Sequence, residues 1–156
     1  MVAYFISLET NSMDDNNDIV LIDTNIIVYA YDTFDKRKHE KCKNIVDGAF
    51  KGEGKFAVSN QILAELFFVL TQKLRNPFSQ EEADSIVSGI IDSVNWIKIN
   101  YDYETVKKAI ISSKLNKNSI WDAIIIETAL ENGIKKIFTE NTKDFKESKI
   151  IATSPL

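Results

Sequence analysis

The stretch "DIVLIDTNIIVYAYD", residues 18–32, indicates how this chain folds. Its first part, 18–23, is short, aliphatic and rich in β-branched residues, as expected of a strand buried inside a sheet. The second part follows without a linker and predicts a helix with Thr24 or Asn25 as its N-cap. A buried strand that leads directly into a helix is typical of the first unit of an α/β fold.

The rest of the chain continues this alternation. Strands are expected at 56–58, 95–99, 134–139 and possibly 149–153, and helices at 38–50, from the cap Ser59 to about Arg75, from near Ser79, and at 103–115 and 120–133. The sequence therefore predicts a three-layer α/β/α sandwich with a mostly parallel sheet of four or five strands. Residues 1–17 are expected to be a flexible leader, with Met1 or Met13 as the true start, and 18–156 a single domain.

Composition excludes some classes of protein. One cysteine, Cys42, rules out an internal disulfide and favours a reducing compartment, most simply the cytoplasm. No apolar run approaches the roughly 20 residues of a membrane span, and the start lacks a signal-peptide pattern. The net charge of −4 argues against a nonspecific DNA-coating protein, but it does not exclude a nucleic-acid enzyme, because local fields matter more than the sum.

Three acidic residues stand in apolar surroundings. Glu65 is the only charge in "ILAELFFVL" (62–70), Asp122 the only one in "SIWDAIII" (119–126), and Asp23 ends the first strand. Burying an unpaired charge costs several kcal/mol, so such groups are normally paired, protonated or bound to a metal. In open α/β sheets, ligands bind at the carboxyl ends of the strands, where the fold can gather these acids.

A divalent cation would make such a cluster tolerable. Glu140 and Asp144 follow the strand at 134–139 and are expected at the same edge of the sheet. Carboxylates repel one another unless a cation neutralises them, and Mg²⁺ or Mn²⁺ prefers oxygen ligands. Zn²⁺ is not favoured, because His39 and Cys42 are the only His and Cys residues. Each acid also has a structural alternative: Asp23 could cap a helix, and Asp122 could favour a helix N-terminus.

Taken together, these motifs resemble the PIN-domain family, and most of all its VapC-type toxins of toxin–antitoxin pairs. The resemblance runs over "VLIDTNIIVYAYD", "SNQILAELFFVL" and "IWDAIIIETALENGIKKIFTENTKDF", about residues 19 to 146. It implies a PIN-like fold and an Mg²⁺- or Mn²⁺-dependent endoribonuclease that cleaves single-stranded or exposed RNA and leaves 5′-phosphate and 3′-hydroxyl ends. It also implies an antitoxin partner, whose tail would cover the acidic groove, and a homodimer.

The same resemblance implies roles for individual residues. Asp23, Glu65 and Asp122 match the family's principal metal-binding and catalytic acids, and Asp144 is the expected fourth. Asn25 and Thr139 match polar positions that hold the acids in place. The chain departs from the pattern at Asn141, where some members carry an acid, and Glu140 could substitute there. RNA would be guided by basic residues, for which Lys36, Arg37, Lys73 and Arg75 are the candidates.

Three other functions are alternatives to the nuclease. A receiver domain needs a phosphoacceptor Asp directly after the third strand, and Asp102 comes several residues late. A haloacid-dehalogenase-like phosphatase needs an acid two residues after Asp23, where this chain has Asn25. The stronger alternative is a PIN-fold protein that binds RNA or a partner without cutting RNA.

Overall fold

The computed structural model describes residues 19–156, so the leader predicted at 1–17 lies outside the described residues and stays a prediction. The strands are β1 (Ile19–Ile22), β2 (Lys55–Ser59), β3 (Trp96–Ile99), β4 (Lys136–Phe138) and β5 (Ile151–Thr153). The helices are α1 (Thr24–Tyr31), α2 (Lys36–Lys51), α3 (Asn60–Gln72), α4 (Gln80–Asp92), α5 (Tyr103–Asn116) and α6 (Ile120–Glu131), with a 3₁₀ turn η1 (Thr142–Phe145). These elements confirm the predicted alternation.

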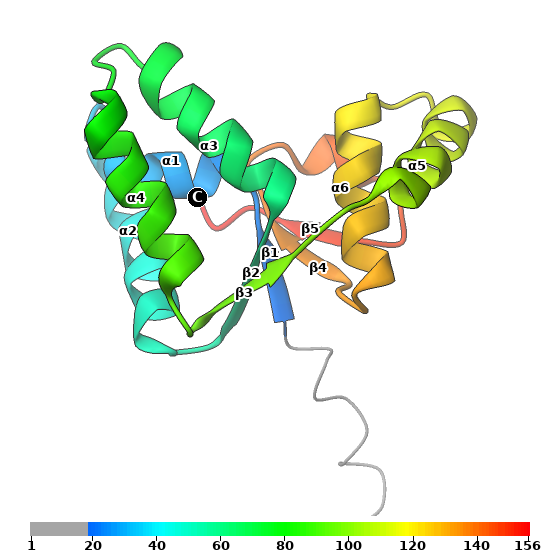
Figure 1. Cartoon of the computed structure of the whole chain (residues 1–156), viewed down its shortest axis with the longest axis horizontal. Helices are drawn as coiled ribbons and strands as arrows, with labels where there is room; N and C mark the ends of the chain where they lie inside the picture. The colour runs from blue at the N-terminus through cyan, green and yellow to red at the C-terminus, as the bar shows by residue number, and fades with distance from the viewer. Residues whose placement is uncertain (1–18) are drawn as a thin grey trace, which may run out of the picture.

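The five strands form one parallel sheet in the order β3-β2-β1-β4-β5. Helices α1 to α4 lie on one side of it and α5 and α6 on the other, which gives the predicted layers (Figure 1). The buried side chains of β1 and β2, such as Leu21, Ile22 and Val58, form the main core with the inward faces of the helices. Within residues 19–156, no helix has both the length and the apolar composition needed to cross a bilayer.

Side-chain caps fix where most helices begin. Ser59 accepts a hydrogen bond from the backbone of Ile62 and caps α3, as predicted. Ser79 caps α4 in a reciprocal pair with Glu82, which satisfies two otherwise free backbone donors. Ser59 therefore sets where α3, the helix that carries Glu65, begins.

Two predicted helix boundaries were wrong. The cap of α1 is not Thr24 or Asn25 but Asp23, which confirms the alternative role expected for that residue: Asp23 has an extended backbone and accepts the amide of Thr24, which is already helical. Helix α3 ends at Gln72 rather than near Arg75. The Leu70 carbonyl, which would accept the amide of residue 74 in a longer helix, accepts the amide of Phe78 at 2.9 Å instead, because the chain folds back over the end of α3.

The strand order creates a switch point at the centre of the sheet. From β1 the chain moves outward to β2 and β3, and then returns to the other side of β1 as β4. The carboxyl ends of β1 and β4 are therefore neighbours, and the amide of Asp23 donates to the carbonyl of Phe138 at 3.0 Å. Ligand sites of open α/β sheets lie at such a point.

Candidate active site

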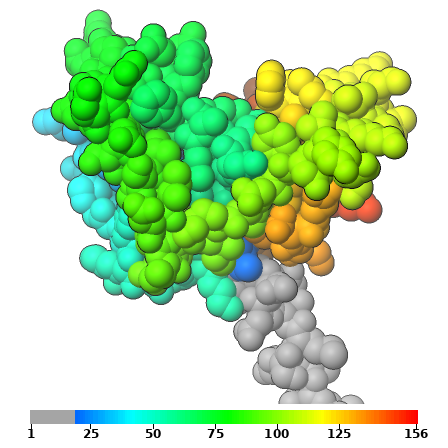
Figure 2. Space-filling model, in the orientation of Figure 1, coloured from blue at the N-terminus to red at the C-terminus, as the bar shows by residue number. Residues whose placement is uncertain are grey.

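A cavity of about 430 Å³ opens beside this switch point. Its lining comes mainly from α1, α3 and α6. Figure 2 shows a hollow between the part of the molecule that carries α3 and α4 and the part that carries α5 and α6. We call the cavity the acidic cavity, and its lining residues are Asp23, Thr24, Asn25, Val28, Tyr29, Asp32, Glu65, Phe68, Val69, Leu74, Asp122, Ile125 and Asn141.

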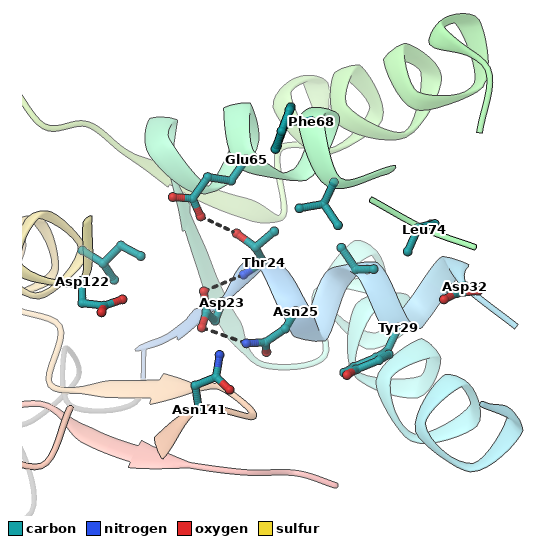
Figure 3. A pocket seen from close by; sticks show the side chains of 13 residues that line it. Asp23, Thr24, Asn25, Tyr29, Asp32, Glu65, Phe68, Leu74, Asp122 and Asn141 are labelled. Atoms are coloured by element: carbon teal, nitrogen blue, oxygen red, sulfur yellow. Dashed lines mark hydrogen bonds between the residues drawn. The ribbon is translucent and has the colours of Figure 1, made fainter. Parts of the chain in front are cut away.

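The structure brings together the three acids that the sequence singled out. Asp23 follows β1, Glu65 lies in the middle of α3, and Asp122 lies in the first turn of α6, yet all three line the acidic cavity. In Figure 3 they surround one end of the cavity, while Leu74 and Asp32 lie at the other end. Acids that are 42 and 57 residues apart in sequence therefore meet only through the fold.

Asp23 is the most tightly held of the three. Its carboxylate accepts hydrogen bonds from the Thr24 amide at 2.8 Å, the Asn25 side chain at 3.1 Å and the Thr139 hydroxyl at 2.6 Å. Burial raises the pKa of Asp23 and the charges of Glu65 and Asp122 raise it further, although the hydrogen bonds from Thr139 and Thr24 oppose the shift. Asn25 and Thr139, which were expected to hold the acids in place, thus both donate to this carboxylate.

Glu65 is positioned by two residues that the sequence analysis missed. The Thr24 hydroxyl donates to Oε2 at 3.0 Å, and the Gln61 side chain donates to Oε1 at 2.8 Å. Gln61 also donates to the carbonyl of Trp121 at 3.1 Å, so one buried amide connects α3 to the start of α6. Its spacing of four residues before Glu65 on a helix was the signal that could have identified it.

Asp122 lies both in the first turn of a helix and beside the acidic cavity. It lies at the N-terminal end of α6, where Ser119 caps the helix and donates its hydroxyl to Asp122 Oδ2 at 2.6 Å. It also lines the acidic cavity. Burial raises its pKa and the nearby charge of Asp144 raises it further, against the hydrogen bond from Ser119.

Glu140, Asn141 and Asp144, which follow β4, lie in three different environments. Asn141 lines the acidic cavity, whereas Asp144 is exposed and shares a neighbouring hollow of about 360 Å³ with Asp122. Glu140 forms an ion pair with Lys38 and accepts a hydrogen bond from the Tyr29 hydroxyl at 2.5 Å. With these partners Glu140 is not a free carboxylate, and Asp144 stays the predicted fourth acid.

The chemistry of the lining suits a divalent metal ion. Four carboxylates line the acidic cavity, from Asp23, Asp32, Glu65 and Asp122, and none of its lining residues is a Lys, Arg or His. In the described part of the chain, no three His, Cys, Asp or Glu side chains stand close enough together to hold one ion. Mg²⁺ does not require three, since it usually keeps several waters and binds through one or two carboxylates.

The predicted RNA-binding residues lie outside the acidic cavity. Arg37 lines a separate smaller hollow, and Lys36 is exposed at the start of α2. Lys73 and Arg75 follow α3, and each lies against an aromatic ring. A role in RNA binding stays a prediction for all four.

His39 and Cys42 do not form a metal site. The His39 ring contacts the Tyr29 carbonyl at 3.0 Å, and Cys42 is fully buried in the core.

Comparisons with known proteins agree with this architecture. The chain has the fold of the sarcin-ricin loop cleaving toxin VapC20 of Mycobacterium tuberculosis (15% identity, TM-score 0.61, 83% of this chain and 95% of that one). It is also similar to a chain of a toxin–antitoxin complex from Klebsiella pneumoniae (18% identity, TM-score 0.59, 88% of this chain and 98% of that one). A chain of DNA-bound VapBC from Salmonella typhimurium is similar as well (18% identity, TM-score 0.62, 90% of this chain and 99% of that one). No curated protein sequence matches the chain. Because the family model described as "PIN domain" matches residues 20–150, the chain belongs to the PIN domain family.

Proposed function

We propose that this protein is a divalent-metal-dependent endoribonuclease that cleaves single-stranded or exposed RNA and acts as the toxin of a toxin–antitoxin pair. The observation that carries the proposal is the convergence of Asp23, Glu65 and Asp122 on one cavity whose lining holds no basic side chain. The negative charges of such a cavity repel a phosphodiester when no cation is bound. A bound divalent cation neutralises them and attracts the phosphodiester. Membership of the PIN domain family and the similarity in fold to VapC20 support the same function.

The residues of the candidate site would have separate roles in metal binding and catalysis. One or two Mg²⁺ or Mn²⁺ ions would each bind through one or two carboxylates among Asp23, Asp122 and Asp144 and keep several waters. Thr139 and Asn25 would keep the Asp23 carboxylate in one orientation. The metal, when bound, lowers the pKa of a coordinated water and neutralises charge on the scissile phosphate. Glu65, which accepts hydrogen bonds from Thr24 and Gln61, would ligate a metal ion or orient the attacking water.

A cognate antitoxin and a homodimer complete the proposal. The toxin–antitoxin complexes of similar fold support a protein inhibitor for this chain. An arginine of that inhibitor could pair with the carboxylates of the acidic cavity in place of the metal. A ribonuclease of this kind would act in the cytoplasm.

Incubation of the purified protein with an unstructured, end-labelled RNA tests this function. We expect cleavage with Mg²⁺ or Mn²⁺, none with EDTA, and none with Asp23→Asn. Loss of a metal ligand exceeds the roughly 10- to 100-fold loss that removal of an outer-shell partner causes. Asp92→Asn is the matched control. Asp92 is exposed at the end of α4, just before β3 begins, so it lies near the amino ends of the strands, whereas the acidic cavity lies at their carboxyl ends.

The same assay separates the proposal from its alternative. Intact RNA with every metal, together with RNA binding by the wild-type protein, would identify a non-catalytic RNA-binding PIN protein. Equal cleavage by wild type and Asp23→Asn would assign the activity to a contaminant and contradict the proposal.

A further inference from the structure

Two exposed aromatic rings, each with a cation against it, lie beyond the acidic cavity. Lys73 Nζ lies 5.3 Å from the centre of the Phe68 ring, and Arg75 Cζ lies 4.9 Å from the centre of the Phe34 ring. Phe68 is 52% exposed and Phe34 is 65% exposed, although phenylalanine is usually buried. We call these four residues the aromatic shelf.

The aromatic shelf continues the acidic cavity. Phe68 and Leu74 line the cavity, and Leu74 stands between Lys73 and Arg75 in the chain. At the same end, Asp32 lines the cavity and its carboxylate accepts the amide of Phe34. In Figure 3 Asp23 and Asp122 lie on one side of the view, Phe68 lies above the middle, and Leu74 and Asp32 lie on the other side. A chain that leaves the acids along this surface therefore reaches the shelf.

We propose that the aromatic shelf binds the single-stranded RNA that flanks the scissile phosphate, with bases stacked on Phe68 and Phe34 and with Lys73 and Arg75 against the backbone phosphates. This inference rests on the proposed function, since it assigns a path to the substrate of that site. Proteins that hold single strands without sequence preference combine aromatic platforms with cations in this way. The acids cannot attract RNA by themselves, so affinity must come from neighbouring groups such as these.

The chemistry of the shelf favours RNA over an apolar peptide. An apolar peptide has no group that binds the cations beside the rings. A nucleotide has a base that can stack on the ring and a phosphate that can pair with the cation. Stacking is tolerant of base identity, so the shelf gives affinity and direction with little sequence preference. Recognition of a particular sequence would have to come from elsewhere on the protein.

Fluorescence anisotropy with a labelled oligouridylate of about 12 nucleotides, in EDTA so that no cleavage occurs, tests the shelf. Phe68→Leu keeps an apolar side chain but removes the π face, and we expect roughly 5- to 150-fold weaker binding. Phe68→Trp keeps the π face and should bind as tightly as wild type. Circular dichroism checks that both variants fold, which the exposure of Phe68 favours.

The cations are tested through the salt dependence of binding. Lys73→Gln should lower the slope of log affinity against log salt by about 0.7 in magnitude, the contribution of one phosphate contact on a single strand. Lys136→Gln is the matched control, because Lys136 is an exposed lysine at the amino end of β4, away from the acids. It should leave both affinity and slope unchanged.

Wild-type affinity in Phe68→Leu, or equal weakening in Phe68→Leu and Phe68→Trp, would overturn the proposal. Cleavage with Mg²⁺ is measured separately, so the two proposals fail independently. A wild-type protein that cuts RNA while Phe68→Leu binds normally contradicts the shelf alone, and one that binds through the shelf without cutting contradicts the nuclease alone.

Discussion

The hydroxyl of Thr139 connects the parts of the candidate site, and Thr139→Val removes it with almost no change in shape. Thr139 is fully buried. Its hydroxyl donates to Asp23 at 2.6 Å and accepts from the Asn141 amide at 3.0 Å and the Asn25 side chain at 3.3 Å. One donor and two acceptor positions are thus all used. We expect this variant to destabilise the fold and to loosen Asp23.

The expected cost follows from these three bonds. Loss of a hydrogen bond to a charged acceptor costs about 1.5–3 kcal/mol. The other two add little: Asn25 keeps its bond to Asp23 at 3.1 Å, and exposed Asn141 lets water reach its amide. The free energy of unfolding should therefore fall by about 2 kcal/mol, a sizeable part of the 5–15 kcal/mol typical of a domain.

Thr128→Val is the matched control for this loss. Thr128 is also fully buried, but its hydroxyl donates to a neutral acceptor, the carbonyl of Ile124 in its own helix, at 2.6 Å. Removal of that bond should cost below about 1 kcal/mol, because the carbonyl retains its helical amide partner. Urea denaturation of both variants and wild type, followed by circular dichroism in EDTA, measures the difference.

The pH dependence of the Thr139→Val effect checks its cause. The hydroxyl stabilises the charged form of Asp23 and lowers its pKa against the raising effect of burial. The loss should therefore be largest at neutral pH and should shrink as the pH falls through the folded pKa of Asp23, which lies above 3.8. A cost equal to that of Thr128→Val, or one that does not change with pH, would refute the reasoning.

Three further outcomes follow from the site and the core. Glu65→Gln should fold normally and lose RNA cleavage by roughly 100-fold or more, measured with end-labelled RNA, and wild-type turnover would exclude a catalytic role. Burial raises the folded pKa of Asp122 above 3.8, so its charged form costs stability at higher pH. Asp122→Asn without metal should therefore raise the melting temperature at neutral pH and not below pH 3.8, and a uniform gain would contradict this. Burial also raises the pKa of Cys42 to about 11, so a thiol reagent should label it at neutral pH only after unfolding.

Local patterns predicted the fold well because they act over a few residues. The aliphatic run before Asp23 and the capping residues Ser59 and Ser79 each fixed an element close to its observed position. The predicted helix caps Thr24 and Asn25 were wrong because Asp, Thr and Asn can all serve as caps. The choice among them depends on where β1 ends against β4, which is a tertiary contact.

The site was predictable only in part, for the same reason. A lone acid in an apolar segment can be recognised without neighbours, and Asp23, Glu65 and Asp122, which line the acidic cavity, were singled out in this way. The hydrogen bond from Thr24 to Glu65 joins residues 41 positions apart and leaves no trace in local sequence, so this role of Thr24 was missed. Glu140 was expected near the site as a possible ligand, but the position of Lys38 on α2 could not be read from spacing.

A crystal of the protein soaked in Mn²⁺, with data collected for anomalous scattering, tests the central claim most directly. We predict a peak in the acidic cavity, in contact with oxygens of Asp23 and at least one of Glu65 and Asp122, and no such peak in Asp23→Asn crystals. A cavity without a peak at saturating Mn²⁺, or a peak held elsewhere on the protein, would contradict the claim that these acids gather to hold a cation.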